Sequence, residues 1–124
     1  TGKFITKHKN GSTHMEGYYI NGLKEYAWTE FYDNNQKKKY TNYESGIKQG
    51  SSSEWSKHGE SFGNYINGKK DGLWHEYIDS KKKSKKIFYA NGVRQLTRYS
   101  TFNLLISIVI TLAIFIHFFS SFMS

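Results

Sequence analysis

The sequence contains neither cysteine nor proline, and its final stretch contains no charged residue. Without cysteine the chain cannot form a disulfide framework, a thiolate zinc site, an iron–sulfur cluster or a cysteine nucleophile. The 18 Lys and Arg and the 10 Asp and Glu residues all lie between Lys3 and Arg98, and they give a net charge of +8 over 124 residues. The chain therefore divides into a basic, polar part and an apolar tail, and its length allows one small folded domain.

The apolar tail predicts a transmembrane helix over residues 102–123. These 22 residues carry no formal charge. As a helix they would be roughly 33 Å long, which is enough to cross the hydrocarbon core of a bilayer. A buried core helix and a glycolipid-anchor signal are the alternatives. A domain of roughly 100 residues is too small to surround a helix that is apolar on every side, so we favour the membrane span.

Charges that flank the span predict its orientation. Because basic residues precede it and none follows it, the positive-inside bias places residues 1–101 on the cytoplasmic or matrix side. We therefore expect a single-pass, tail-anchored protein. The flanking basic residues are Lys81, Lys82, Lys83, Lys85, Lys86, Arg94 and Arg98.

Three polar residues lie within the predicted span. Ser107 and Thr111 are four residues apart and share one helix face, where we expect them to pack against a neighbouring helix. His117 lies near the distal end. An ionisable residue in a membrane is a functional candidate, but at this depth we expect a neutral, hydrogen-bonded histidine.

The polar part is an internal repeat. The pattern Tyr-x-x-Gly starts at Tyr19, Tyr43, Tyr65 and Tyr89, in steps of 24, 22 and 24 residues. A shift of 46 residues aligns residues 17–46 with 63–92 and leaves 13 of 30 positions identical, among them both tryptophans of the aligned segments. The sequence therefore predicts a stack of similar units of about 23 residues, each too small to be stable alone.

Each unit has the pattern of a β-hairpin. Gly22, Gly46, Gly68 and Gly92 suit turn positions with positive φ, and asparagine precedes three of them. Asn-Gly is the strongest short-range hairpin signal. We expect a mainly β protein in which antiparallel hairpins over residues 3–99 form an elongated twisted sheet and bury aromatic side chains against one another.

The third unit, GNYINGKKDGLWHEY, resembles the MORN (membrane occupation and recognition nexus) repeat, in particular the bacterial-type variant also found in antitoxin-like proteins. The residues that carry the resemblance are Gly63, Tyr65, Gly68, Gly72, Trp74 and Tyr77. The resemblance covers residues 3–99 and implies a β-hairpin fold without intrinsic enzymatic activity.

The other units match the MORN pattern with departures. The first keeps Gly17, Tyr19, Gly22 and Trp28, but Tyr26 replaces its second glycine. The next keeps Tyr43, Gly46 and Gly50, but Ser52 stands at the tryptophan position. The last keeps Tyr89 and Gly92 before the pattern degenerates, as terminal units of repeat arrays do.

Nothing in the sequence predicts a catalytic, cofactor or metal site. His8 and His14 are six residues apart, too far to share one helical face, so we interpret them as exposed hairpin residues. Glu30 and Glu76 recur with the repeat, which marks them as part of its framework. The run Ser51-Ser52-Ser53 is interpreted as a linker or loop, and the glycines recur at hairpin spacing rather than phosphate-loop spacing.

Two lysine clusters occupy equivalent places in the repeat, at residues 37–39 and 81–86. Near a membrane, each lysine can contribute about 1 kcal/mol of attraction to anionic lipid headgroups. Solvated hairpin tips that keep a β-sheet soluble are the alternative, and we favour it for residues 37–39. Nucleic-acid binding is disfavoured because the aromatic residues are periodic and needed for the core. The candidate lipid contacts are Lys81, Lys82, Lys83, Lys85 and Lys86.

The sequence as a whole favours a non-catalytic scaffold or accessory subunit of a larger membrane protein complex, with other subunits and membrane lipids as partners and no small-molecule substrate. A mitochondrial energy-transducing assembly, in the inner membrane, fits the size, basic charge and single span. Two alternatives stay open. One is a module that binds anionic lipids at a membrane surface, and the other is an antitoxin-like regulatory protein that captures a soluble partner.

Overall fold

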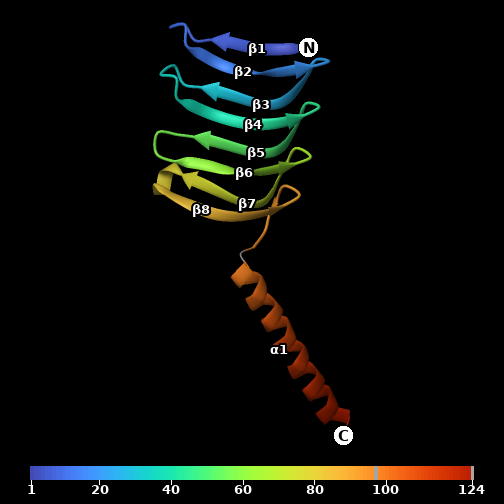
Figure 1. The fold of residues 1–124 in the computed structure, drawn as a ribbon. Coiled ribbons are helices and arrows are strands. Elements are labelled where there is room, and N and C mark those ends of the chain that lie inside the picture. Colours follow the sequence, from blue (N-terminus) through green and yellow to red (C-terminus); the bar gives the residue numbers. More distant parts are fainter. Residues whose placement is uncertain (97, 124) are drawn as a thin grey trace.

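A computed structural model describes residues 1–96 and 98–123, with the side chains of residues 1–96 and 104–123. Within these residues, nine antiparallel strands form one open sheet in chain order, and one helix follows (Figure 1). The elements are β1 (Gly2–Lys7), β2 (Thr13–Ile20), β3 (Leu23–Phe31), β4 (Lys37–Glu44), β5 (Ile47–Trp55), β6 (Glu60–Ile66), β7 (Lys69–Ile78), the 3-10 turn η1 (Asp79–Lys81), β8 (Lys83–Ala90), β9 (Val93–Arg94) and α1 (Arg98–Met123). The predicted fold class is confirmed.

Two kinds of connection alternate along the sheet. On one side, two-residue turns join β2 to β3, β4 to β5, β6 to β7 and β8 to β9, and both turn residues have positive φ. This is the type I′ conformation, whose twist matches that of the flanking strands. Asn21 (φ 49°) and Gly22 (φ 76°) form the first of these turns. Longer loops join the strands on the other side.

Successive turns are tied together by backbone hydrogen bonds. Gly46 N–H donates to the carbonyl of Lys24, and Gly68 N–H donates to that of Lys48, at 2.8 and 2.9 Å. One side chain also accepts from each turn, as when Glu25 Oε1 accepts from Ser45 N–H at 2.7 Å. Neighbouring hairpins are thus held by contacts that recur once per unit, which fixes the spacing of the array.

A β-bulge recurs in strands β3, β5 and β7. In β3 the pairing with β2 passes from Tyr18↔Glu25 to Glu16↔Thr29, so that extra β3 residues face Gly17. Tyr26 at this bulge has φ 59°, where the next units have Gly50 and Gly72 at φ 91° and 70°. The backbone therefore requires positive φ at the second glycine of the repeat, which glycine adopts freely. Tyr26 adopts it in a strained conformation.

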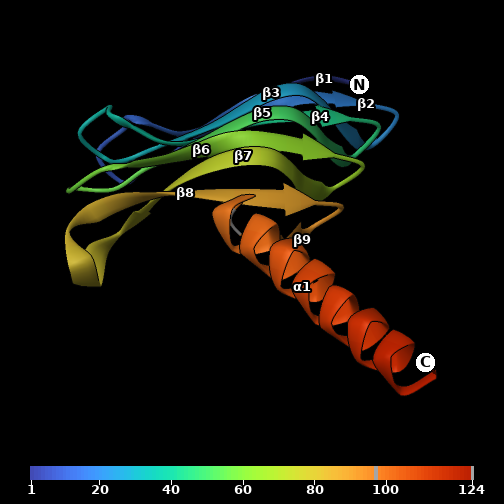
Figure 2. The same cartoon turned by 90° about the horizontal axis from the view of Figure 1, so that it is seen from below.

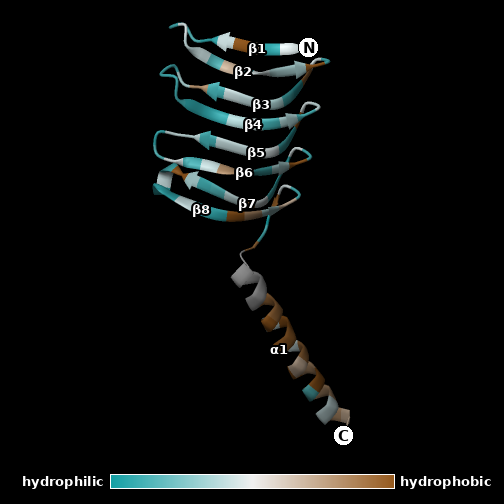
Figure 3. Cartoon of the chain, in the orientation of Figure 1, coloured by the Kyte–Doolittle hydropathy of each residue, from teal (hydrophilic) through white to brown (hydrophobic). Residues whose placement is uncertain are grey.

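The sheet is one curved layer, and no second layer of described residues covers it (Figure 2). Its buried hydrophobic side chains are Trp28, Trp74 and Ile87. Thr29, Thr41 and Ser52 are buried polar residues. The hydropathy colouring shows a mixed sheet and a predominantly apolar helix (Figure 3). With so little buried surface per unit, stability depends on the pairing of neighbouring hairpins.

The structure corrects one interpretation of the sequence. Residues 51–53 are not a linker, because they lie inside β5 and pair with both β4 and β6. Serine runs resemble loops in composition, but here the neighbouring strands supply the pairing and Ser52 is buried.

Helix α1 begins at Arg98, before the predicted span of 102–123, and ends at Met123. Its segment Leu104–Met123 is the one helix among the described residues that is long and apolar enough to cross a membrane. Every described side chain of this segment is exposed, as expected of a lipid-facing helix. Of the flanking basic residues, the Arg98 side chain lies outside the described residues.

Candidate functional site: the indole face of the sheet

We define the indole face as the face of the sheet that carries Trp28 and Trp74. Side chains that stand directly opposite each other in paired strands share a face. By this criterion, the strand register places on the indole face all four tyrosines that begin a Tyr-x-x-Gly pattern. These tyrosines were predicted as repeat framework, and the structure brings them into one column: Tyr19, Tyr43, Tyr65 and Tyr89.

A cation stands opposite each of these tyrosines. The pairs are Tyr19↔Lys24, Tyr43↔Lys48, Tyr65↔Lys70 and Tyr89↔Arg94. Each lysine also contacts the tyrosine of the next unit: Lys24 Nζ lies 5.1 Å from the Tyr43 ring centroid and Lys48 Nζ 4.8 Å from that of Tyr65. Tyrosines and cations therefore alternate in an unbroken ladder across β2–β9, with cation–π contacts between units.

Trp28 and Trp74 each lie on a glycine of the preceding strand. A Cβ atom on Gly17 would stand 2.2 Å from the Trp28 indole, and one on Gly63 would stand 2.3 Å from that of Trp74. Trp28 and Trp74 are 5% and 4% exposed. Each indole Nε1–H donates to a backbone carbonyl, that of Tyr18 at 3.2 Å or Asn64 at 3.0 Å. The first glycine of the pattern, which has no Cβ atom, therefore leaves the space that the indole ring occupies.

Tyr77 is held in a similar way, because a Cβ atom on Gly59 would stand 2.3 Å from its ring. The predicted framework residues thus have distinct physical roles. Gly22, Gly46, Gly68 and Gly92 lie in the type I′ turns, and Gly72 lies in the bulge of β7.

The middle unit replaces both members of the glycine–tryptophan pair. Thr41 stands at the glycine position, Ser52 stands at the tryptophan position, and their hydroxyl groups share a hydrogen bond of 2.9 Å. Ser52 Oγ also donates to the carbonyl of Tyr40 at 3.0 Å. Both hydroxyl groups are therefore satisfied in a buried position where an indole stands in the neighbouring units.

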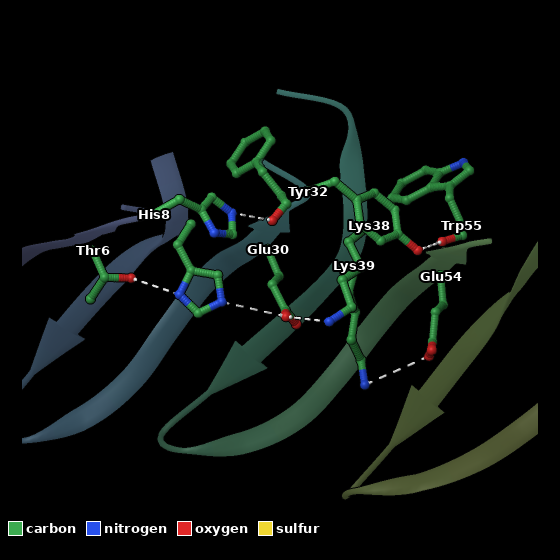
Figure 4. Close-up of polar contacts among 10 residues, drawn as sticks. Thr6, His8, Glu30, Tyr32, Lys38, Lys39, Glu54 and Trp55 are labelled. Atoms are coloured by element: carbon green, nitrogen blue, oxygen red, sulfur yellow. Dashed lines mark hydrogen bonds and ion pairs between the residues drawn. The ribbon is translucent and has the colours of Figure 1, made fainter. Parts of the chain in front are cut away.

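A second column on the indole face carries the carboxylates Glu30, Glu54 and Glu76. Lys38 Nζ donates to Glu30 at 2.7 Å, and this hydrogen bond holds the pKa of Glu30 below its ordinary value while it raises that of Lys38. Lys39 lies 3.7 Å from Glu54. Figure 4 shows these pairs side by side at the loop side of the sheet.

Glu76 is held by two donors. Lys70 Nζ donates at 2.6 Å and Tyr89 Oη at 2.9 Å. Burial would raise the pKa of Glu76, but these hydrogen bonds outweigh it and hold the pKa below its ordinary value. Burial and the bond to Glu76 raise the pKa of Tyr89. Burial alone would lower the pKa of Lys70, yet the contact with Glu76 raises it.

His8 and His14 lie together, with ring centroids 4.6 Å apart. The turn that joins β1 to β2 brings the two rings together at an angle of 50°, a relation that reasoning from helical spacing could not reveal. His8 Nε2 donates to the carbonyl of Phe31 at 2.9 Å (Figure 4), and His14 Nε2 lies 3.7 Å from Glu30. The described residues contain no group of three His, Asp or Glu side chains placed to hold a metal ion.

The five predicted lipid-contact lysines lie on η1, β8 and the turn between them, and all are exposed. None of them forms an ion pair with another described residue. The equivalent cluster differs, because Lys38 and Lys39 are paired with carboxylates. In the helix, Thr111 Oγ1 donates to the carbonyl of Ser107 at 2.9 Å, and His117 is exposed.

A hollow of about 340 Å³ opens on the indole face over β6. Its floor includes Ser52, Gly59 and Ser61, and Trp74, Tyr77 and Tyr65 line its aromatic side. The charged residues around it are Lys39, Glu54, Lys70, Glu76 and Asp79. The sequence shows a serine at position 52, whereas the space beside it is visible only in the structure.

Comparison with protein-family profiles, with curated proteins and with solved structures finds no match for this chain. The resemblance to MORN repeats therefore rests on the residues quoted above and stays a prediction.

Proposed function

We propose that this protein is a non-catalytic scaffold anchored in a membrane, which binds other subunits of a larger membrane complex through its sheet. The observation that carries the proposal is a single-layer sheet with both faces open, followed by a 20-residue apolar segment. A single layer offers large surfaces to partners, while the recurring carboxylates Glu30, Glu54 and Glu76 of the indole face are engaged in ion pairs. These features favour binding over chemistry.

The proposal is tested by native electrophoresis of membranes solubilised in mild detergent, followed by mass spectrometry. We expect the protein to migrate with a large complex in a fixed ratio to the other subunits. Migration as a free monomer from freshly solubilised membranes would contradict the proposal.

We further propose that the sheet lies on the cytoplasmic or matrix side of the membrane, and the inner mitochondrial membrane is the location that we favour. The support is the basic charge before the helix and the absence of charge in the tail. Protease treatment of sealed vesicles of known orientation tests the orientation, because the sheet would be cleaved from one side only. Fractionation of organelles tests the location.

Binding of anionic lipid is a second candidate function. It is favoured by the five exposed lysines of η1 and β8, which form no ion pair with another described residue. They lie at and before β8, the strand that pairs with β9, and only residues 95–97 separate β9 from α1. Three residues span at most about 11 Å, so the end of the sheet at Arg94 must stay near the membrane surface.

The lipid candidate is tested with the full chain in nanodiscs that contain either zwitterionic lipid alone or added anionic lipid. K82Q/K83Q/K85Q removes three lysines of this cluster, and K9Q/K37Q/K57Q removes three exposed lysines elsewhere, so the two variants have equal net charge. If the cluster binds headgroups, anionic lipid protects the β8 amides of wild type from hydrogen exchange at low salt. The first variant loses this protection and the second keeps it; equal behaviour would contradict the candidate.

A further inference from the structure

The hollow on the indole face exists because two adjacent repeat positions carry serine. Ser52 stands where the neighbouring units carry Trp28 and Trp74. Ser61 stands on β6 at the position where β2, β4 and β8 carry a long side chain, namely Met15, Lys39 and Lys85. Two independent departures from the repeat therefore remove bulk from one place and open a space of about 340 Å³.

The lining of the hollow is rich in hydrogen-bond acceptors. Its lining contains three carboxylates and two ammonium groups, so its local charge is negative although the chain has a net charge of +8. Lys70 is committed to Glu76 at 2.6 Å, and Lys39 lies near Glu54. The Asp79 carboxylate accepts no hydrogen bond and forms no ion pair with the part of the chain that the structure describes.

The hydroxyl groups of the floor are already used. Ser61 Oγ accepts from Tyr77 N–H at 2.9 Å, and Ser52 is bonded to Thr41 and to the carbonyl of Tyr40. The hydrogen-bond acceptors that stay available are the Asp79 carboxylate and Glu54 Oε1, because Lys39 lies by Glu54 Oε2. Both residues line the hollow together with Tyr77. An anionic ligand would be repelled there, and a neutral ligand would leave this acceptor capacity unpaired.

We propose that this hollow binds an arginine side chain of a partner protein. A guanidinium group is planar, carries five donors that match carboxylates, and stacks on aromatic rings. The open space is large enough for the whole side chain, whose aliphatic stem would lie over Gly59 and Ser61. The inference deepens the proposed scaffold function and rests on it for its biological meaning, whereas the binding itself is measured separately from complex formation.

The test is a titration of the full chain, labelled with ¹⁵N in neutral detergent micelles, with N-acetyl-arginine amide. The chain has three tryptophans, so its indole signals are easily resolved. We expect saturable shifts of the Trp74 indole and the Ser61 amide at millimolar ligand, while the Trp28 indole does not move. N-acetyl-citrulline amide has the same shape without the charge, and it should leave all these signals in place.

Two variants separate the site from general charge effects. E54Q/D79N removes the two available carboxylates, and E44Q/E60Q removes two carboxylates that do not line the hollow. Each exposed ion pair contributes a fraction of a kcal/mol, so we expect E54Q/D79N to weaken arginine binding about fivefold or more. E44Q/E60Q should bind as wild type does.

A third variant fills the space without changing the charge. S61M places on β6 the side chain that β2 carries at the equivalent position, and we expect it to abolish the arginine-dependent shifts while the β2 and β3 amide signals stay unchanged. The proposal is overturned if citrulline and arginine amides act alike, if E54Q/D79N binds as wild type does, or if N-acetyl-glutamate amide binds more tightly. These results do not depend on whether the protein migrates with a complex.

Discussion

Tyr26 shows how one residue can depart from the repeat and still adopt its backbone. Its φ of 59° lies in the left-handed region, which Gly50 and Gly72 occupy at the equivalent positions without steric cost. The side chain gains little in return, because it is 63% exposed and its ring centroid lies 6.2 Å from that of Tyr18. The bulge is therefore imposed by the neighbouring hairpins and not by the local sequence.

Replacing this tyrosine with glycine should stabilise the sheet. We expect Y26G to raise the free energy of unfolding by about 0.5–1 kcal/mol, since relief of the left-handed strain exceeds the entropy cost of a glycine. Urea unfolding followed by tryptophan fluorescence measures the change. Y26F keeps the strain and should unfold like wild type; a loss of stability in Y26G would mean that the Tyr18 contact outweighs the strain.

The carboxylate of Glu76 should make stability depend on pH. Because its folded pKa lies below the ordinary value of 4.5, its contribution is complete above that value and is lost as the pH falls through the folded pKa. We expect E76Q to be less stable than wild type at pH 7, and we expect this difference to shrink as the pH falls below 4.5. E44Q, which removes an exposed carboxylate, is the control, and an unchanged difference between pH 7 and pH 3 would contradict the prediction.

At the scale of the hairpin, the glycine–tryptophan pair acts as one unit of packing. Glycine is required opposite Trp28 and Trp74, because a Cβ atom on Gly17 or Gly63 would enter the indole ring. Where Ser52 replaces tryptophan, Thr41 replaces glycine, and the two hydroxyl groups bond to each other. The sequence alone shows two separate departures from a pattern, whereas the strand register shows one coordinated exchange.

This coupling can be measured by restoring the pair. We expect S52W alone to lower the free energy of unfolding by about 1–3 kcal/mol, because the indole would collide with the Thr41 side chain. T41G/S52W should recover at least half of that loss. A double-mutant cycle in urea gives the coupling energy. Additive effects of the two substitutions would contradict the idea that they form one packing unit.

At the scale of the whole molecule, the sheet behaves as a one-dimensional array. Every strand pairs only with its neighbours in the chain, and aromatic residues cluster around Trp28 and around Trp74. In such an array, disruption of one unit is felt most by the units beside it. In the function that we propose, the helix is the membrane anchor and the sheet supplies the surfaces for partners.

Substitution of a core residue should destabilise the strands beside it more than the distant strands. We expect W74A to cost about 3–5 kcal/mol and to accelerate amide hydrogen exchange in β6–β8 more than in β2–β3. W28A should give the reverse pattern and serves as the matched control. Equal acceleration along the whole sheet in both variants would show that the array unfolds as one cooperative unit.

The sequence by itself determined the turns, the repeat length and the apolar helix. The turns follow from local chemistry, since residues such as Asn67 and Gly68 accept positive φ, and the helix follows from length and composition. Tertiary structure alone decided which side chains meet across strands. The pairing of His8 with His14, the burial of Ser52 and the hollow over Ser61 depend on strand register and bulges, and these are set by contacts between units.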